Sequence, residues 1–298
     1  MAAGPIRIGV IGGSGLYGMA ELTDIEERAV ETPFGPPSDA LTIGTLGGER
    51  VAFLPRHGRG HRFAPTDVPY RANIWAMKSL GVQFLIAVSA VGSLREELAP
   101  LHLVVPDQLV DRTVARPRTF FDAEAGMVAH VSLAEPFCAA TRAALLAAAQ
   151  APEVGARVHD GGSYICIEGP QFSTKGESRL FRGWGLDIIG MTAFPEARLA
   201  REAELCYAML AMVTDYDVWH EEEEPVTVQV VIERLHRNAA AAQAVVRALV
   251  PRLAALPACA DDGEALANAI ITDPARIPAE TKNRLGLLLG RHLPGYRK

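Results

Sequence analysis

Strand-like apolar runs alternate with helix-like segments along this chain, and this alternation is the feature that most constrains its fold. The runs "IRIGVIGG", "VQFLIAVSAVGS" and "LAMVTDYD" are typical of buried strands, whereas "YRANIWAMKSLG" has apolar residues at helical spacing. Strands that alternate with helices predict an α/β fold with a central mixed β-sheet flanked by helices. In such folds the site residues follow the carboxyl ends of the strands.

The domain organisation follows from the distribution of Pro, Gly and Ser. No linker rich in these residues divides the 298 residues. We therefore expect one main domain over residues 1–254, with residues 255–298 as a helical extension packed on the same domain. Two alternating runs around Gly47 and Gly48 predict a hairpin. A long amphipathic helix is expected from Pro225 to Leu253, with the proline near its first turn.

Composition argues against several classes of protein. The formal net charge is -6, so no basic face for nucleic acid is expected. No run approaches the ~18 apolar residues of a membrane span. The four cysteines never form C-x-x-C, which predicts neither disulfides nor a metal site. An early strand-like run leaves no room for a signal peptide, and we expect a cytoplasmic protein.

The stretch "IGVIGGSGLYGMA" contains Gly13, Gly15 and Gly18 and matches the dinucleotide pattern G-x-G-x-x-G. A dinucleotide site also needs a crossover helix and a second strand that ends in an acid ~20 residues later. The next segment, "AELTDIEERAVETPFGPPSDA", is too short and too rich in proline for this, so NAD binding is disfavoured. Glycine turns also expose N–H groups, and with Ser14 this turn is suited to an oxyanion. The alternative is a tight turn without a ligand.

Two further strand ends carry groups that bind anions. Arg56 and His57 follow the hairpin in "LPRHGRGHR" and offer a bidentate fork and a ring N–H. Ser89 and Ala90 end a buried strand and offer a hydroxyl and backbone N–H groups. Convergence of such turns at one sheet edge favours free inorganic phosphate, because the G-x-x-x-x-G-K-[ST] loop is absent. The alternative for the basic segment is a solvated loop.

The second half of the chain offers a pocket for a flat base. Phe172 provides an aromatic face next to Ser173. Asp215 and Asp217 are two residues apart, so their side chains point the same way if the chain is extended. A carboxyl there can share a proton with a ring nitrogen of a leaving purine. Metal ligation or a helix N-cap is the alternative for this pair.

An ordered series of motifs resembles the trimeric purine nucleoside phosphorylases. It covers about residues 6 to 250 and includes "GVIGGSGL", "TPFGPPSDAL", "RHGRGH", "SAVGSLREE", "IEGPQFS", "GMTAFPEA" and "TDYDVW". The resemblance implies a phosphorylase-like α/β fold and a homotrimer. It also implies that inorganic phosphate is a co-substrate and that neither a cofactor nor a metal ion is required.

Particular residues acquire roles through this resemblance. The implied phosphate site comprises Ser14, Arg56, His57, Ser89, Ala90 and Thr192. The implied contacts to the nucleoside are Met191 at the ribose, and Phe172, Ser173, Asp215 and Asp217 around the purine. A 5′ substituent would meet an apolar helix face and one histidine from a neighbouring subunit, namely Val228, Val231, Ile232 and His130. Ordinary core packing explains the helix face equally well.

The acid pair indicates which base the chain selects. The family's 6-oxopurine enzymes typically have Asn at the first acid and Glu at the position of Ser173, so "TDYD" resembles the branch that selects adenine. The implied reaction is phosphate-dependent cleavage of S-methyl-5′-thioadenosine to adenine and 5-methylthioribose 1-phosphate, in purine and methionine salvage. Asp215 would be the general acid, and Asp217 would recognise the amino group. The alternatives are a phosphorylase for inosine or guanosine, a nucleosidase that uses water, and a non-catalytic nucleotide-binding protein.

Overall fold

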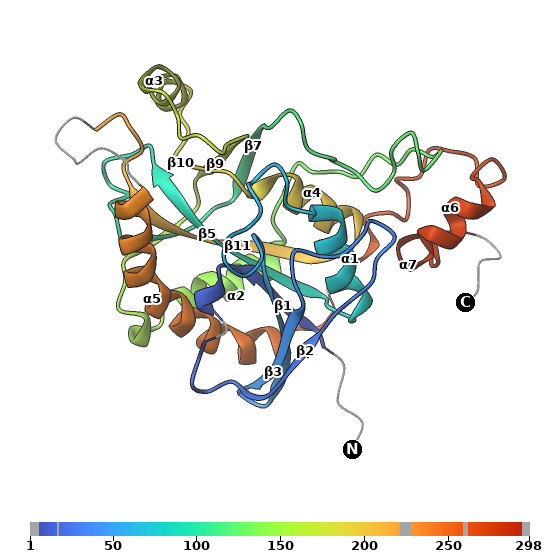
Figure 1. Cartoon of the computed structure of the whole chain (residues 1–298), viewed down its shortest axis with the longest axis horizontal. Coiled ribbons are helices and arrows are strands. Elements are labelled where there is room, and N and C mark those ends of the chain that lie inside the picture. Colours follow the sequence, from blue (N-terminus) through green and yellow to red (C-terminus); the bar gives the residue numbers. More distant parts are fainter. Residues whose placement is uncertain (1–5, 17, 221–227, 259–261, 294–298) are drawn as a thin grey trace.

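The central element is an eleven-stranded mixed sheet, as the alternation of runs predicts (Figure 1). The structure is a computed structural model and describes residues 6–16, 18–220, 228–258 and 262–293. The strand order is β2-β3-β4-β1-β5-β10-β9-β7, with β11 beside β5, β6 beside β11 and β8 beside β6. The strands are β1 (Ile8–Gly12), β2 (Thr23–Arg28), β3 (Leu41–Leu46), β4 (Glu49–Pro55), β5 (Phe84–Ser93), β6 (Leu103–Val105), β7 (Gln108–Arg112), β8 (Val158–Asp160), β9 (Ser163–Ile167), β10 (Ile188–Gly190) and β11 (Cys206–Asp215).

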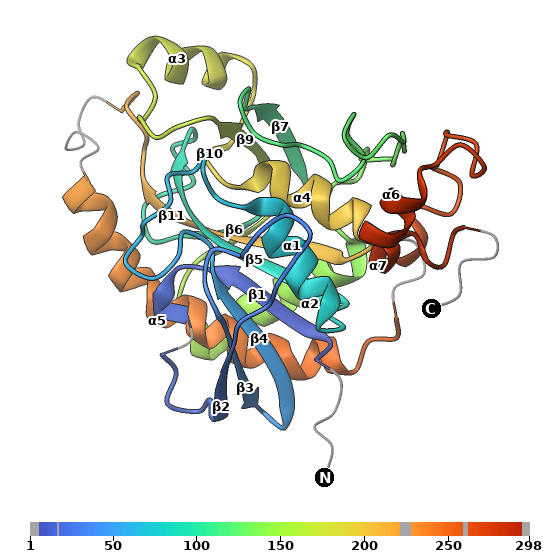
Figure 2. The ribbon, with the colours of Figure 1, turned by 45° about the vertical axis from the view of Figure 1, so that its right-hand side comes forward.

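Helices cover both faces of the sheet (Figure 2). Alternate residues of β5 point to opposite sides, because side chains alternate along a strand. Leu85 and Ala87 belong to the core that includes α1 and α4, whereas Phe84 and Ile86 belong to the core that includes α2 and α5. The helices are α1 (Tyr70–Ser79), α2 (Ala139–Ala149), α3 (Lys175–Gly183), α4 (Ala193–Glu202), α5 (Val228–Ala254), α6 (Ala279–Arg284) and α7 (Gly286–Leu289).

The predicted hairpin is confirmed as the antiparallel pair β3 and β4. Gly47 and Gly48 connect the strands with φ of 58° and 87°, a conformation that glycine adopts without steric cost. β1 leads into the 3-10 turn η1 (Ser14–Leu16) and then into β2. The crossover helix of a dinucleotide site is thus absent from the described residues between β1 and β2, as the sequence indicated.

The C-terminal residues share the core of the α/β unit. Residues 262–293 form the 3-10 turn η3 (Asp262–Glu264), α6 and α7, and Leu266, Leu285 and Leu289 are buried in the core of α1 and α4. The buried Glu204 accepts a hydrogen bond of 3.0 Å from the Leu266 amide. The domain division at residue 254 stays a prediction. Among the helices of the described residues, none combines the length and apolar character that a bilayer crossing requires.

Candidate active site

Four parallel strands bring the predicted loops to one edge of the sheet. β4, β1, β5 and β11 lie next to one another in this order and run in the same direction. β4 and β1 end next to Arg56 and the turn η1, and β11 ends at Asp215. Ser89 lies inside β5, which continues to Ser93, so the prediction that Ser89 and Ala90 end a strand is wrong. Ser89 nevertheless lies level with the end of β1, because Ile11 pairs with Ala87. The side chain of Ser14 is outside the described part of the structure, so its contact with phosphate stays a prediction.

Arg56 forms a buried ion pair with Glu196 from α4. The Nε atom donates to Oε2 over 2.7 Å and Nη2 donates to Oε1 over 2.9 Å. The same guanidinium donates to the carbonyl oxygens of Val88 (3.0 Å) and Ile11 (3.2 Å), and Tyr207 donates its hydroxyl to Glu196 (3.0 Å). The fork that the sequence offers to phosphate is thus occupied by Glu196, and its charge is balanced. A phosphate contact by Arg56 stays a prediction.

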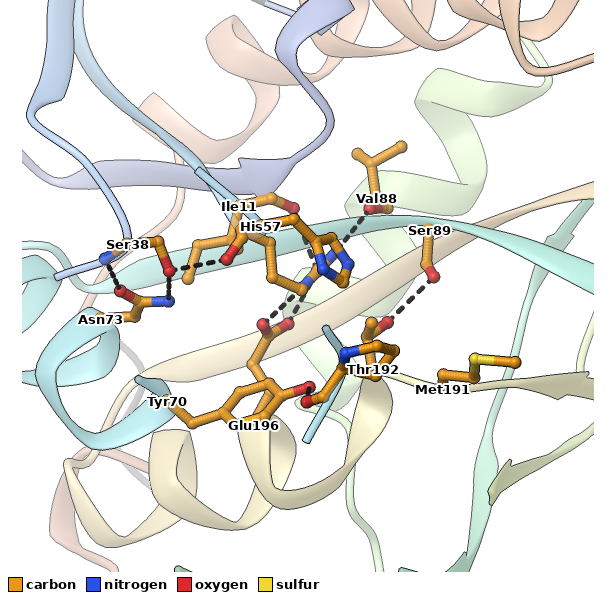
Figure 3. A network of polar contacts seen from close by, with 12 residues as sticks. Ile11, Ser38, His57, Tyr70, Asn73, Val88, Ser89, Met191, Thr192 and Glu196 are labelled. Atoms are coloured by element: carbon orange, nitrogen blue, oxygen red, sulfur yellow. Dashed lines mark hydrogen bonds and ion pairs between the residues drawn. The ribbon is translucent and has the colours of Figure 1, made fainter. Parts of the chain in front are cut away.

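The His57 ring lies beside this ion pair (Figure 3). Its Nδ1 lies 2.9 Å from the carbonyl oxygen of Phe63. Because a carbonyl only accepts, the proton must be on Nδ1. Burial, together with the nearby Arg56 cation, lowers the pKa of His57 to about 4, so the ring is neutral at pH 7. The sequence predicts a ring N–H donor for phosphate at His57, but in this tautomer the Nδ1–H is bonded to Phe63 and Nε2 is an acceptor; the contact with phosphate stays a prediction.

Ser89 and Thr192 place two hydroxyl groups together (Figure 3). Their oxygen atoms are 3.0 Å apart, and both residues are buried. The antiparallel pairing of β10 with β5 brings Thr192 back along β5 toward Ser89, in agreement with the resemblance, which implies that both belong to one site. Ala90 is the next residue of β5. The pair offers two hydroxyl donors for an oxyanion at the edge where the parallel strands end.

Asp215 and Asp217 lie next to each other, although the chain is not extended through both. β11 ends at Asp215, and Asp217 has a φ of 51°, so the prediction of two carboxyls on one strand face is wrong. A turn instead directs the amide of Asp217 to Oδ1 of Asp215 (2.8 Å), while the Thr214 hydroxyl donates to Oδ2 (2.7 Å). Burial raises the pKa of Asp215. Burial and the charge of Asp215 raise the pKa of Asp217 to about 6.

The predicted purine and ribose residues follow β9 and β10. Phe172 is 39% exposed and Ser173 is buried, and the hydroxyl of Ser173 faces Asp217. A Cβ atom at Gly169 would lie 2.7 Å from the sulfur of Met191, so this glycine permits close contact between the two loops. Arg116, which sequence reasoning missed, donates to the Met191 carbonyl over 2.7 Å. The ribose contact that the resemblance implies for Met191 stays a prediction.

The residues that are expected to contact the 5′ substituent do not all lie together within one chain. Val228 and Ile232 lie on α5 and are 64% and 47% exposed. The side chain of Val231 and the expected helix start at Pro225 are outside the described residues. His130 donates its amide N–H to the Ala269 carbonyl (2.8 Å). In Figures 1 and 2 the C-terminal α6 and α7 lie on the opposite side of the molecule from the start of α5. A contribution of His130 from a second subunit stays a prediction.

One buried group of polar side chains lies away from this site. The thiols of Cys138 and Cys206 and the carboxylate of Asp262 all lie within 4.8 Å of one another, and Asp262 also pairs with Arg201. No motif identifies this group in the sequence, because its members are far apart along the chain. Cys206 begins β11, so the group is separated from Asp215 by the length of that strand, roughly 30 Å.

The fold and the sheet edge define a class of protein. The profile of the Phosphorylase superfamily matches residues 7–251, and this chain belongs to that superfamily. The family resemblance of the ordered motifs is thereby confirmed.

The similar proteins named below are all methylthioadenosine phosphorylases. The S-methyl-5′-thioadenosine phosphorylase of Gloeobacter violaceus is 57% identical over 296 residues, which is 98% of this chain and 97% of that protein. The structure of a methylthioadenosine phosphorylase from an antarctic soil metagenomic library has a TM-score of 0.90 at 48% identity, over 96% of this chain and 99% of that one. The methylthioadenosine phosphorylase from Schistosoma mansoni in complex with adenine has a TM-score of 0.81 at 40% identity, over 85% and 93%.

Proposed function

We propose that this chain cleaves S-methyl-5′-thioadenosine with inorganic phosphate, giving adenine and 5-methylthioribose 1-phosphate. The observation that carries this proposal is the buried pair Asp215 and Asp217 at the same sheet edge as Ser89 and Thr192. The edge therefore combines a proton donor for a leaving base with donors for an attacking anion. The names of the relatives support the choice of substrate, as does Ser173 where enzymes of the family that act on 6-oxopurines typically have Glu.

Phosphate would bind between the ends of β1 and β4, the segment of β5 at Ser89 and Ala90, and the start of α4. The hydroxyls of Ser89 and Thr192 would donate to its oxygens, together with the Ala90 amide and Ser14. Hydrogen phosphate also carries one P–OH group, and Nε2 of His57 is an acceptor for that proton. Arg56 would contribute positive potential that Glu196 partly balances. Such an arrangement favours the monohydrogen form of phosphate.

The acid pair would assist departure of the base. As the bond from C1′ to N9 breaks, electrons move into the purine and make N7 more basic. Asp215 in its protonated form would give its proton to N7, and its burial raises its pKa toward that role. General acid catalysis of this kind contributes about 10²–10⁴-fold. Asp217 would accept from the amino group of adenine, with Phe172 against the ring.

The phosphate attack itself needs no covalent enzyme intermediate. An oxocarbenium-like sugar forms as the base departs, and a phosphate oxygen held beneath C1′ captures it. The amide of Met191 would hold the ribose hydroxyls, so the enzyme contributes positioning and fixed dipoles. No step in this scheme requires a metal ion or an organic cofactor, and we propose that none is used.

The assembly and setting are part of the same proposal. The exposed Val228 and Ile232 would face the methylthio group, with Val231 on the same helix and His130 from a neighbouring subunit of a homotrimer. The reaction would take place in the cytoplasm and return adenine to purine salvage and methylthioribose phosphate to methionine salvage.

Base release measured by ultraviolet absorbance tests the proposal. S-methyl-5′-thioadenosine, adenosine and inosine are each incubated with the enzyme, with and without inorganic phosphate. Phosphate-dependent adenine release that is fastest with S-methyl-5′-thioadenosine is expected. Release without phosphate would identify a nucleosidase, and release from inosine alone would identify a 6-oxopurine phosphorylase.

A further inference from the structure

β11 contains an irregularity directly before the acid pair. Val213 pairs with Val91 and Asp215 pairs with Gly92, so the register along β5 skips Thr214. A bulge of this kind bends the strand and redirects the side chain that follows it. The direction of the Asp215 carboxyl therefore depends on how firmly the backbone of Thr214 is held.

The neighbouring strand makes space for the redirected carboxyl. A Cβ atom at Gly92 would lie 2.9 Å from Oδ1 of Asp215 and 3.4 Å from Cβ of Asp217. The hydroxyl of Thr214 donates to Oδ2 of Asp215 over 2.7 Å. These contacts involve the carboxyl of Asp215 and the hydroxyl of Thr214. The backbone carbonyl of Thr214 is not part of them, and its hydrogen bond comes from another element.

Helix α5 supplies that support through two side chains one turn apart. Nη1 of Arg234 donates to the Thr214 carbonyl over 2.8 Å, and Nδ2 of Asn238 donates to the Val213 carbonyl over 3.1 Å. Residues four apart lie on the same helix face, so both reach consecutive carbonyls of β11. A guanidinium bond to a carbonyl is charge-assisted and stronger than a neutral one.

We propose that Arg234 is a positioning residue, which aims the carboxyl of Asp215 at the base by holding the bulge at Thr214. Asn238 supports the same backbone from the next helical turn. This inference rests on the proposed function, because Asp215 is the proposed general acid. Arg234 follows Ile232 by two residues, so the helix that would meet the 5′ substituent also holds the acid that would protonate the base.

The charge of Arg234 has a second consequence. The charged groups that face Asp215 in the described structure are Asp217, from the turn after β11, and Arg234, from α5. From β5 the facing residue is Gly92. The positive charge of Arg234 opposes the rise that burial causes in the pKa of Asp215. Removing this charge raises that pKa further, which extends the protonated, active form to higher pH.

The experiment compares variants of the full chain in phosphate-dependent adenine release from S-methyl-5′-thioadenosine. Arg234→Met removes both the donor and the charge, and Arg234→Lys restores both in a shorter form. Arg237→Met is the matched control, because Arg237 is exposed on the same helix. For Arg234→Met we expect kcat to fall by about tenfold to hundredfold, as for a displaced catalytic group, with KM for phosphate within about twofold. Arg234→Lys should recover most of kcat, and Arg237→Met should match the wild type.

The pH profile separates positioning from general stabilisation. The alkaline limb of kcat/KM should move to higher pH in Arg234→Met and remain in place in Arg237→Met. If Arg234→Met does not fold, as judged by thermal unfolding, Arg234→Gln keeps an N–H donor without the charge and should show the same shift of the limb. The inference would be overturned if the Arg234 variants had the kcat of the wild type and an alkaline limb of kcat/KM at the same pH as in the wild type. A wild-type enzyme that releases no adenine with phosphate would overturn the proposed function as well.

Discussion

The guanidinium of Arg56 and the carboxylate of Glu196 form a two-point ion pair beneath the candidate site, with side chains only 3% and 1% exposed. Both carboxylate oxygens are engaged, and one of them also accepts from Tyr207. A pair buried this deeply is strongly interdependent, because removing either partner leaves an uncompensated charge away from water. The pair therefore joins α4 to the end of β1 and the middle of β5, through the carbonyls of Ile11 and Val88.

Glu196→Ala should destabilise the fold. Breaking a buried pair by removing one partner costs about 3–5 kcal/mol, and this loss should appear in the free energy of unfolding in urea. Glu26→Gln is the control, since the Glu26 side chain is 45% exposed in its ion pairs with Arg28 and Arg50 and pairs of this kind contribute only about 0–1 kcal/mol. Equal losses in the two variants would contradict the structural role of the buried pair.

Much of the site's position could be predicted from the sequence, because it depends on local patterns. Apolar runs that end in small or polar residues predicted the strands, and parallel strands bring such ends to one edge. On this basis the sequence predicts that the turns at Ser14, Arg56 and Ser89 converge, and the structure brings these segments to neighbouring strands, although Ser89 lies inside β5 and not at its end. The hairpin at Gly47 and Gly48 was likewise predictable from turn chemistry.

The remainder depends on contacts between distant segments. Glu196 accepts hydrogen bonds from the guanidinium of Arg56, and Arg116 donates a hydrogen bond to the carbonyl of Met191. The sequence does not predict the roles of Glu196 and Arg116, because no local spacing of residues identifies them. A bulge at Thr214 and a turn at Asp217 replace the expected extended chain. A period of two residues predicts side-chain direction only while the strand is regular.

Asp215→Asn should abolish most of the phosphorolysis. The amide retains the shape of the side chain but cannot donate an acidic proton to N7, so kcat should fall by about 10²–10⁴-fold. Phosphate binding, measured by calorimetry, should persist. Asp160→Asn is the control, at an exposed carboxyl on β8. Near-normal turnover in Asp215→Asn would remove Asp215 from its assigned role.

Asp217 should make the fold less stable as the pH rises. Its native pKa is raised to about 6, against about 3.9 in an unfolded chain, so the native state binds this proton more tightly. The stabilising contribution is complete below pH 4 and is lost as the pH rises through about 6. Asp217→Asn should therefore be more stable than the wild type by about 1–3 kcal/mol at pH 8, and the difference should vanish near pH 4. Urea unfolding at both pH values tests this, with the exposed Asp24→Asn as control; a gap that did not depend on pH would refute the prediction.

Ser89→Ala and Thr192→Val should weaken phosphate binding specifically. Hydrogen bonds to charged groups contribute about 1.5–3 kcal/mol, which corresponds to roughly a tenfold to hundredfold rise in KM for phosphate. KM for the nucleoside should change little. Ser79→Ala is a matched control, because that hydroxyl donates to a carbonyl within α1. Equal effects on both substrates would indicate a general disturbance of the sheet edge.

Mixing two impaired variants should raise the activity if His130 acts across a subunit boundary. Asp215→Asn lacks the acid, and His130→Ala lacks the proposed contact to the 5′ group, so each preparation alone should be impaired at low substrate concentration. The two chains are unfolded together and refolded as mixed oligomers, which would be trimers under the proposed assembly. Some sites then combine the intact Asp215 of one chain with the intact His130 of its neighbour, about a quarter of all sites for equal, random mixing.

The controls decide where His130 acts. Each variant refolded alone gives the baseline, and the mixture should exceed the sum of the two baselines. If His130 served the site of its own chain, every site in the mixture would lack one of the two groups, and no gain would appear. The separation of α6 and α7 from the start of α5 in Figures 1 and 2, together with the bond from His130 to Ala269, leads us to expect the gain.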